Sequence, residues 1–552
     1  MTRTKKSARR GKRNADVAPA ASNKKQKKGT TKATTAVAPA ATATANGEKG
    51  SREWAESTLT KLLGGMSLDT FVSEYFEKKP LHVRKADKGA LFGSGLFSRK
   101  KMLKVMEKQP RPMSFGKDLT VCRYVNSERE NFDGEDTNGH ATSRQVASLL
   151  DRDYSCQFYQ PQRHVDGLYE LNAAFEEVFG GLAGASAYLT PANSQALAPH
   201  HDDVEVFVVQ TQGRKKWKLY HPLVELAGEH SSDLAEDQIG EPWMELVVEE
   251  GDVLYFPRGV VHQACTDEKE FSTHVTISVY QHNTWANFLE VALPRVIRQA
   301  FDSDVSFRKG LPVDYLSVMG TQFPADSAKA KEFMATCKKL VGKLAAHVSE
   351  KDLQEAADDA ALDVLANRLP PPAEKKKKGD DESGPSPLDG NVAICFKNRS
   401  HIRLSMGEDE MKEAFVAVYF SLHNCRRHHM GLCTCDGGDE DEDEEGKEGE
   451  EEEDGSDAGE DAETGSAGGD HGDDQSDDED EDPSAALGQM PPQPNSIVFP
   501  GELAPALMKL YAASTPGASI DELAEAASDE TAVRGMLLRL WSEGLLDVTT
   551  QS

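Results

Sequence analysis

The chain contains one region, residues 187–281, in which short β-strand patterns follow one another closely. Runs of β-branched and aromatic residues alternate there with turn residues, for example in Gln212-Gly213-Arg214-Lys215 and in Pro257-Arg258-Gly259. The first turn predicts a hairpin that joins strands at 207–210 and 216–220. Strands at this spacing are typical of an antiparallel sandwich or jelly roll. We therefore predict an α+β protein whose core is a jelly roll, also called a double-stranded β-helix.

A His-x-Asp motif precedes the first of these strands, within Ala198-Pro199-His200-His201-Asp202-Asp203. If the strand begins there, the alternation of side chains places His200 and Asp202 on one face. An imidazole and a carboxylate side by side are two thirds of a 2-His-1-carboxylate site for non-haem Fe(II). The spacing alone does not choose the site, because it also occurs at His164/Asp166, His201/Asp203 and His471/Asp473.

The surrounding sequence favours His200 and Asp202 among these pairs. A third ligand, His262, follows the Pro257-Arg258-Gly259 turn, and a jelly roll brings such positions to one cavity. A lone histidine in a strand is more often a hydrogen-bonded core residue than a ligand, but three converging residues reverse that preference. Lys215 follows the predicted hairpin turn and would suit a carboxylate ligand on the same wall, although by itself it would be a surface lysine.

The formal net charge of −30 on 552 residues is concentrated in one tract. Residues 436–482 hold 27 acidic side chains and one lysine, so the remainder is close to neutral. No apolar run is long enough for a membrane span, and the N-terminus lacks the apolar core of a signal peptide. We therefore expect a soluble, intracellular protein with no membrane partner. In such a chain the eight cysteines are expected to be free thiols.

The N-terminal half begins with a basic tail, residues 1–52, which has too few apolar groups to fold. Its paired lysines and arginines are typical of nuclear or nucleolar targeting or of a nucleic-acid arm, with a solvated tail as the alternative. The catalytic jelly-roll domain is expected at 53–287. Residues 288–369 have helical spacing, and for this domain dimerisation and simple packing on the catalytic core are equal alternatives.

The C-terminal part begins with a linker at 370–387, rich in proline and lysine. Residues 388–552 are expected to form a winged-helix domain of three helices and a strand, interrupted by a disordered acidic insertion at 436–486 that suits basic partners. The third helix carries only Arg534 and Arg539 as basic groups, so a protein contact or a structural role is favoured over DNA binding.

Just before the acidic insertion lies a group of zinc-type ligands: Cys425, His428, His429, Cys433 and Cys435. Their spacing is not that of a paired-cysteine zinc knuckle. We therefore favour loop thiols over a structural zinc site, which stays open as the alternative.

Four motifs together resemble the JmjC-type ribosomal oxygenases, from about residue 53 to the winged helix. These are cupin-fold, 2-oxoglutarate- and Fe(II)-dependent protein histidyl hydroxylases, and one branch is also described as a histone lysine demethylase. The basic tail resembles that of the nucleolar branch. The motifs are Tyr188-Leu189-Thr190-Pro191-Ala192-Asn193-Ser194-Gln195, Ala198-Pro199-His200-His201-Asp202-Asp203, Gly213-Arg214-Lys215 and Tyr255-Phe256-Pro257-Arg258-Gly259 with His262-Gln263-Ala264.

The resemblance implies a role for each matching residue. The Fe(II) ligands would be His200, Asp202 and His262, and Lys215 would pair with the distal carboxylate of 2-oxoglutarate, with O2 at the remaining position. Other matching residues would lie around the co-substrate or the substrate: Tyr188, Thr276, Asn193, Ser278 and His274. Two positions depart from the pattern and leave the branch open: Gln157, where the branches differ between arginine and glutamine, and His201, where tyrosine is usual.

The resemblance thus implies an Fe(II)- and 2-oxoglutarate-dependent dioxygenase that hydroxylates a histidine of a large-subunit ribosomal protein in the nucleus or nucleolus. Demethylation of lysine on a histone tail is the rival within the enzyme class, and formaldehyde would distinguish it. A non-catalytic scaffold for chromatin or ribosome assembly is the rival from another class. The presence of His200, Asp202, His262 and Lys215 together argues against the scaffold.

Overall fold

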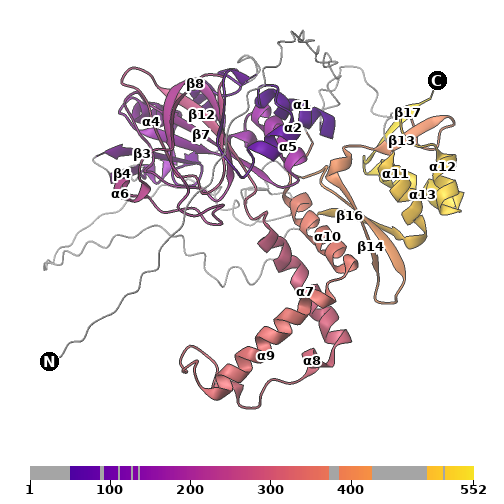
Figure 1. The fold of residues 1–552 in the computed structure, drawn as a ribbon. Helices are drawn as coiled ribbons and strands as arrows, with labels where there is room; N and C mark the ends of the chain where they lie inside the picture. The colour runs from indigo at the N-terminus through magenta and orange to yellow at the C-terminus, as the bar shows by residue number, and fades with distance from the viewer. Residues whose placement is uncertain are drawn as a thin grey trace, which may run out of the picture. The chain divides into compact units, whose positions relative to one another are not determined.

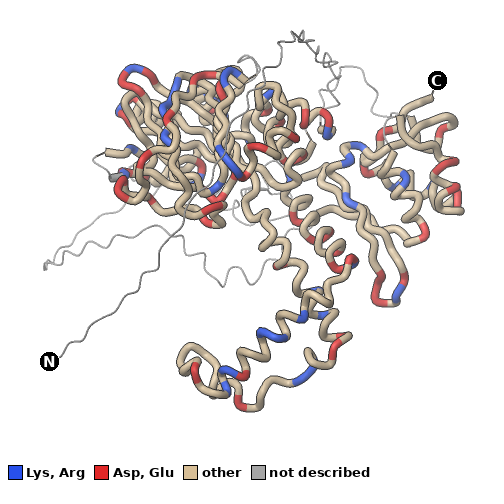
Figure 2. The backbone as a smooth tube through the Cα atoms, in the orientation of Figure 1, with Lys and Arg blue, Asp and Glu red and all other residues tan. Residues whose placement is uncertain are grey.

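The computed structural model of the chain describes residues 50–86, 92–109, 112–125, 128–134, 137–371, 385–424, 494–513 and 516–551. The basic tail, most of the predicted linker, the acidic insertion and the group from Cys425 to Cys435 lie outside the described residues. Basic and acidic side chains are interspersed over the described elements (Figure 2). No helix in the described ranges is long and apolar enough to cross a membrane.

The core of the region 53–287 is an antiparallel sheet in the order β1-β10-β8-β12-β7-β6-β3-β4, with β9 and β11 paired to the second half of β8 (Figure 1). This is the jelly-roll arrangement expected from the strand spacing. Its strands are β1 (Leu81–Val83), β3 (Leu119–Val125), β4 (Glu128–Phe132), β6 (Ser155–Tyr159), β7 (Ala183–Thr190), β8 (Glu205–Leu219), β9 (Met244–Glu249), β10 (Val253–Phe256), β11 (His262–Cys265) and β12 (Ser272–Val279). A separate pair joins β2 (Met113–Ser114) to β5 (His140–Ala141).

The predicted hairpin at 212–215 is wrong, because β8 runs through it as one continuous strand. The first half of β8 pairs with β10 and β12, and the second half pairs with β9 and β11. Between the halves, Gly213 has φ +61°, and the register with β12 shifts near Thr273. The first half of β8 thus belongs to one layer, with β10 and β12, and the second half to another, with β9 and β11. A strand that passes from one such sheet to the other needs a bend of this kind. A turn residue in the sequence therefore marks a corner rather than a strand end.

A group of helices covers the sheet near its β1 end. They are α1 (Arg52–Leu62), α2 (Leu68–Glu74) and α5 (Asp166–Phe179), while α3 (Arg99–Glu107) and α4 (Ser143–Leu150) pack near β6. Buried aromatic rings join helices to strands: Phe71 of α2 lies 4.8 Å from Tyr255 and 5.7 Å from Phe207, and Phe175 of α5 lies 4.9 Å from Phe207, between ring centroids. This apolar core supports β8 and β10 from the side opposite the site described below.

The predicted helical region is present beyond the sheet as α7 (Trp285–Ser303), α8 (Val305–Arg308), α9 (Ala328–Leu344) and α10 (Glu350–Asn367). Thr284 caps α7 through a hydrogen bond to the Asn287 N–H. The side chain of Arg295 joins α7 to α10 by ion pairs with Glu355 and Asp359. Helices were therefore correctly expected here from the apolar spacing.

The C-terminal region contains the three expected helices, α11 (Ala504–Ala512), α12 (Ile520–Ala527) and α13 (Glu530–Ser542), followed by β17 (Leu546–Thr550). The sequence did not indicate the strands they pack against: β13 (Val392–Phe396), β14 (Ile402–Glu408), β15 (Ala414–Phe420) and β16 (Asn495–Pro500). β13 pairs with β17, and β14, β15 and β16 form a three-stranded sheet. Because β13 and β17 are more than 140 residues apart in sequence, their pairing has no local signal.

Candidate metal centre

Two chain segments meet at the candidate centre. His200 lies between β7 and β8 and forms an antiparallel bridge with His262, the first residue of β11. The N–H of His262 donates to the carbonyl of His200 at 2.8 Å, and the reverse bond is 3.2 Å long. The carbonyl of Asp202 accepts the N–H of Gly259 at 2.9 Å. Backbone hydrogen bonds therefore hold together the two segments that carry the candidate metal ligands.

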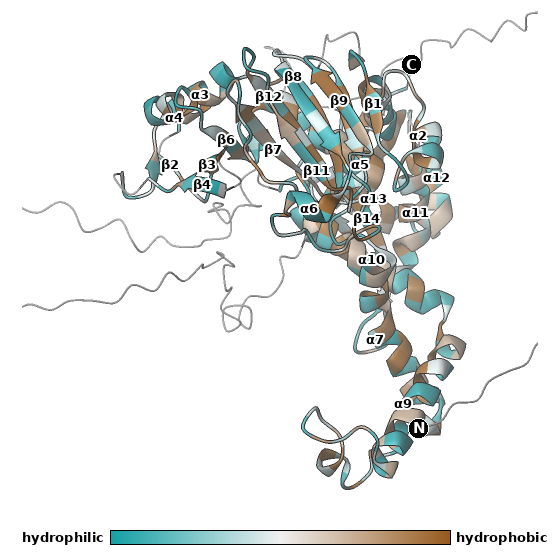
Figure 3. Cartoon of the chain, turned by 60° about the vertical axis from the view of Figure 1, so that its left-hand side comes forward, coloured by the Kyte–Doolittle hydropathy of each residue, from teal (hydrophilic) through white to brown (hydrophobic). Residues whose placement is uncertain are grey.

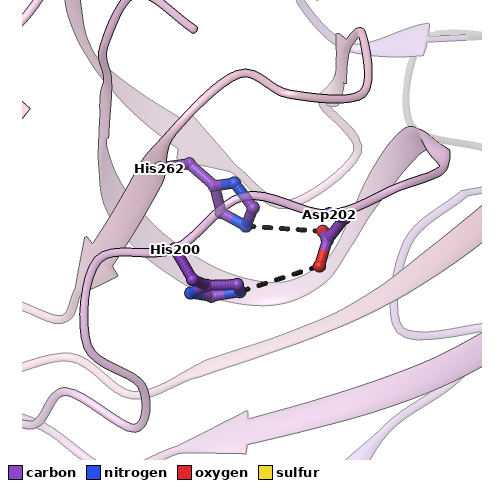
Figure 4. Close-up of side chains that lie close together, drawn as sticks. All are labelled: His200, Asp202 and His262. Carbon is purple, nitrogen blue, oxygen red and sulfur yellow. Dashed lines mark ion pairs between the residues drawn. The ribbon is translucent and has the colours of Figure 1, made fainter. Parts of the chain in front are cut away.

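The three side chains converge as predicted, although not by strand alternation. β8 begins only at Glu205, so His200 and Asp202 lie in the irregular segment ahead of it. The Nε2 atom of His200 is 3.9 Å from Asp202 Oδ1, and that of His262 is 3.7 Å from Asp202 Oδ2 (Figure 4). All three ligand atoms lie within 4.8 Å of one another, and no other such group occurs within the described ranges.

Hydrogen bonds determine which nitrogen of each imidazole has a lone pair available for a metal. Nδ1 of His200 is 2.8 Å from the carbonyl of Ala198, and Nδ1 of His262 is 3.1 Å from that of Val260. Because a carbonyl only accepts, each Nδ1 carries the proton and each Nε2 presents a lone pair. Burial and the neighbouring His200 lower the pKa of His262 to about 4, which keeps that ring neutral. Two neutral imidazoles and one carboxylate with oriented donor atoms fit a divalent iron ion.

A cavity opens at these three side chains. Its wall is largely aromatic and aliphatic, with a few polar groups among them. The residues that line it, besides the three candidate ligands, are Tyr188, Ala196, Leu197, Val206, Lys215, Trp217, Phe256, Gln263, Ala264, His274 and Thr276. Four of the residues expected around the co-substrate or the substrate are thus brought to the cavity, namely Lys215, Tyr188, Thr276 and His274.

Lys215 places a buried cation in the cavity wall. Its side chain is 4% exposed, and Nζ donates to Thr190 Oγ1 at 3.1 Å. Burial lowers the pKa of the Lys215 ammonium to about 8. Within the described residues no carboxylate lies within ion-pair distance of it, so this charge has no protein counter-ion there. A buried ammonium of this kind is stabilised when an anionic ligand enters.

Tyr188 forms the opposite part of the lining on β7. Its hydroxyl accepts a hydrogen bond from Gln157 Nε2 at 3.0 Å, and its ring stacks on His274 with centroids 4.8 Å apart. Burial raises the pKa of the Tyr188 phenol well above its usual value, so the hydroxyl stays protonated and keeps a hydrogen to donate. Gln157, one of the two positions that depart from the family pattern, therefore orients a cavity residue.

The other predicted residues lie outside this cavity. Asn193 is exposed in the turn after β7 with φ +52°, and Ser278 lies on β12 beyond Thr276, in the lining of a second, larger cavity. His201 is buried, and its backbone N–H donates to Ser231 Oγ at 2.9 Å. The structure does not bring Asn193 or Ser278 to the three candidate ligands.

Sequence reasoning gave no role to several residues of the wall, among them Trp217, Phe256 and Gln263. Trp217 lies two residues after Lys215 on β8, where buried and exposed residues alternate. The period-2 rule would have found it once 212–215 was understood as part of a strand. Gln263 faces the cavity directly after His262 and donates to the Tyr220 hydroxyl at 2.6 Å, which no sequence signal indicated.

Comparison with known proteins agrees with this architecture. Residues 157–288 match the family described as "JmjC domain", and this stretch contains all three candidate ligands. The fold and the site therefore define a JmjC protein of the cupin type, with antiparallel sheets and additional helices.

Three curated relatives are similar over most of the chain. Mouse ribosomal oxygenase 2 is 34% identical over 388 residues, covering 68% of this chain and 79% of the relative. Zebrafish (Danio rerio) ribosomal oxygenase 1 is 33% identical over 397 residues, covering 69% and 70%. Human ribosomal oxygenase 1 is 36% identical over 403 residues, covering 70% of this chain and 60% of its own length. The chain belongs to the ribosomal oxygenase family.

Two further proteins complete the comparison. A relative from Culex quinquefasciatus named "Bifunctional lysine-specific demethylase and histidyl-hydroxylase NO66" is 33% identical over 380 residues, covering 66% of this chain and 56% of the relative. The solved structure of Escherichia coli ycfD aligns with 88% of this chain and 98% of its own, with 12% identity and a TM-score of 0.40. The chain thus spans between 56% and 79% of the curated relatives named here.

Proposed function

We propose that this protein is an Fe(II)- and 2-oxoglutarate-dependent protein oxygenase. The observation that carries the proposal is the convergence of His200 Nε2, His262 Nε2 and the Asp202 carboxylate in a cavity whose wall holds the buried ammonium of Lys215, for which the described part of the chain offers no counter-ion. When bound, Fe(II) and 2-oxoglutarate supply the oxidising chemistry in which O2 gives one oxygen atom to a substrate C–H bond and the other to succinate, with release of CO2.

The chain's own residues hold these components in defined places. The two histidines and Asp202 would hold the metal at the cavity. Lys215 pairs with the distal carboxylate of 2-oxoglutarate, and Thr276 and the Tyr188 hydroxyl offer hydrogen bonds from neighbouring strands. The rings of Tyr188 and His274 form a packed wall that keeps water away from the metal face.

We infer a histidine of a large-subunit ribosomal protein as the substrate, because relatives are named ribosomal oxygenase or histidyl-hydroxylase. The same centre would act on an N-methyl group, since a hydroxylated N-methyl group decomposes to formaldehyde and free lysine. The name of one relative includes lysine-specific demethylase, so a methylated histone tail is the second candidate. Mass gain of one oxygen on a ribosomal peptide supports the first substrate, and formaldehyde release supports the second.

We propose that the helical region, 288–369, supports a homodimer. The residues Leu289, Leu293, Ile297 and Phe301 recur every four positions on α7 and are 38–51% exposed. An adjoining face of α7 is buried through Ala292, Val296 and Ala300. Figure 3 shows hydrophobic residues along this helix. An exposed apolar stripe of this length is typical of a helix that packs against another copy.

The remaining assignments are proposals of the same kind. The helices α11–α13 with β17 support a winged-helix domain within 388–552, and Arg534 and Arg539 are both paired with glutamates on α13 or just after it, which favours a protein contact over DNA. The basic tail, 1–52, suits a nuclear or nucleolar location, and the acidic insertion, 436–486, suits basic partners.

The decisive experiment is an anaerobic titration of the purified chain with Fe(II) and 2-oxoglutarate. Chelation of iron by the 2-oxo acid in the site produces a metal-to-ligand charge-transfer band in visible absorbance. The band is expected in the native protein and absent from His200→Ala, which loses one of three ligands. If iron-loaded, folded protein shows no band, the oxygenase assignment is wrong and the scaffold for chromatin or ribosome assembly takes its place.

A further inference from the structure

A buried group of charged side chains lies behind the candidate metal centre, on the side of β8 and β10 that faces away from the cavity. Glu205, the first residue of β8, is fully buried, and Arg258, just after β10, is 6% exposed. Val206 and Phe256 line the cavity. Because side chains alternate along a strand, their neighbours Glu205 and Tyr255 point to the opposite face.

Both Nη atoms of Arg258, the carboxylate of Glu205 and the hydroxyl of Tyr255 have specific partners, while Nε of Arg258 has none among the described residues. Arg258 Nη1 donates to Glu205 Oε1 at 3.0 Å, and Nη2 pairs with Glu77 Oε1 at 2.7 Å. The Tyr255 hydroxyl donates to the second carboxylate oxygen of Glu205 and accepts the N–H of Glu77 at 2.9 Å. A single guanidinium thus lies between two carboxylates, and the phenol closes the network. Such a group holds its geometry strongly, because breaking it leaves a buried charge without a partner.

The network joins the same two segments that carry the candidate ligands. Glu205 lies three residues after Asp202, and Arg258 lies four residues before His262. On the cavity side, the hydrogen bonds that join these segments are between backbone groups, among them Gly259 N–H to the Asp202 carbonyl, and the ligand side chains themselves are 3.7 Å apart at His262 Nε2 and Asp202 Oδ2. The pair of Glu205 and Arg258 is a buried side-chain connection between the same segments on the far side of the strands.

We propose that Glu205, Arg258 and Tyr255 form a positioning clamp that fixes the spacing of the metal ligands before the metal binds. The inference rests on the metal centre proposed above. None of the three lines the cavity, so they act through Asp202 and His262 and not on the metal or a substrate. Groups that hold metal ligands in place typically change metal affinity by about 10- to 100-fold when they are lost.

The test uses Co(II), which replaces Fe(II) without oxidation and has its own visible absorbance. The full-length metal-free protein is titrated with Co(II), and the dissociation constant is compared with that of Glu205→Gln. The clamp predicts a dissociation constant about tenfold higher or more in the variant. His200→Ala, which lacks one of the three candidate ligands, gives the dissociation constant that is expected when the metal centre is lost.

A matched control separates positioning from general stability. Glu177 on α5 forms a similarly buried pair with Arg368 at 2.8 Å, but Glu177 is not part of the cavity lining. Glu177→Gln and Glu205→Gln are both expected to lower the melting temperature, because each removes one of the two carboxylates that pair with a buried arginine. Only Glu205→Gln is expected to weaken Co(II) binding.

Each outcome decides one point. A Co(II) dissociation constant for Glu205→Gln within twofold of the native value, or an equal loss in Glu177→Gln, overturns the clamp and leaves the proposed function standing. If Glu205→Gln does not fold, Tyr255→Phe keeps all the charges and removes the two hydrogen bonds of the phenol. It is expected to bind Co(II) more weakly, and unchanged affinity again overturns the clamp. If native protein binds Co(II) no better than His200→Ala does, the proposed metal centre itself is wrong.

Discussion

At the scale of single residues, the cavity depends on how burial changes the chemistry of a few ionisable groups. Lys215 would be an ordinary surface lysine on a hairpin, but on a continuous β8 it is enclosed by the sheet and keeps only Thr190 as a hydrogen-bond partner among the groups near it. Its lowered pKa, about 8, means that it loses its charge just above neutral pH. An anionic co-substrate bound by this ammonium would therefore be sensitive to mild alkali.

This environment predicts a pH dependence of 2-oxoglutarate binding. Below pH 8 most protein molecules have a charged Lys215 that binds the carboxylate. Above pH 8 a growing fraction of the molecules has a neutral Lys215, which must take up a proton before it can pair with the carboxylate. The apparent dissociation constant should thus be nearly constant from pH 6.5 to 7.5 and about tenfold higher at pH 9 than at pH 7. Equilibrium dialysis with metal-loaded protein measures it.

Lys215→Arg provides the control, because arginine stays charged throughout this range. If that variant still binds 2-oxoglutarate, its affinity should be flat up to pH 9. A pH profile that is identical in native protein and Lys215→Arg would show that another group titrates.

At the scale of elements, the bend of β8 decides whether Lys215 and Trp217 reach the cavity. Gly213 has φ +61°, and a Cβ atom there would lie 1.9 Å from the carbonyl oxygen of Phe271. Only glycine permits both the left-handed conformation and this close approach. The corner between the two sheets thus depends on one residue without a side chain.

Gly213→Ala is expected to lower the free energy of unfolding by about 3 kcal/mol or more, because strain and a backbone clash add. Gly139→Ala is the comparison, since Gly139 has φ +74° but open space where its Cβ would stand. Gly139→Ala should lower the free energy of unfolding by only about 1 kcal/mol. Urea denaturation measures both, and equal losses would show that the contact with Phe271 is unimportant.

The C-terminal helices offer a second test at this scale. Leu537 and Leu538 are adjacent on α13, but Leu537 is fully buried and Leu538 is 40% exposed. Leu537→Ala should destabilise by about 2–5 kcal/mol, and Leu538→Ala by about 0.5 kcal/mol or less. Thermal unfolding followed by circular dichroism distinguishes them. Similar values for the two variants would contradict the packing of α13 on its strands.

At the scale of the whole molecule, the exposed stripe on α7 indicates that the described chain does not cover all of its apolar surface. Leu289, Leu293, Ile297 and Phe301 form this stripe, and the adjoining face with Ala292, Val296 and Ala300 is buried within the chain. Four large apolar side chains in a row would otherwise remain in contact with water, so a second copy is the partner that we propose for this surface.

Ile297→Glu combined with Phe301→Glu should convert the dimer to a monomer, because two charges per copy would be buried at the interface. Size-exclusion chromatography with light scattering measures the mass. The control is Gln299→Glu, which adds a charge at an exposed position off the stripe. A native protein that elutes as a monomer, or a double variant that stays dimeric, contradicts the proposal.

The sequence by itself determined the parts of this protein that depend on local pattern. Alternation and turn residues indicated the jelly roll, and periodic apolar residues indicated α7, α9 and α10 as well as α11–α13. Residue chemistry selected His200, Asp202 and His262, because few arrangements other than a metal centre use two imidazoles and a carboxylate at converging positions.

Only the tertiary structure decided the features that depend on contacts between distant segments. The continuity of β8 through Gly213 follows from pairing with β12 and β9, and the pair β13–β17 joins segments far apart in sequence. The same holds for the cavity wall, which separates Lys215 and Thr276 from Asn193 and Ser278, and for the network of Glu205 and Arg258 behind it. Local pattern reports which face of an element is apolar, whereas burial and register arise only when elements pack against one another.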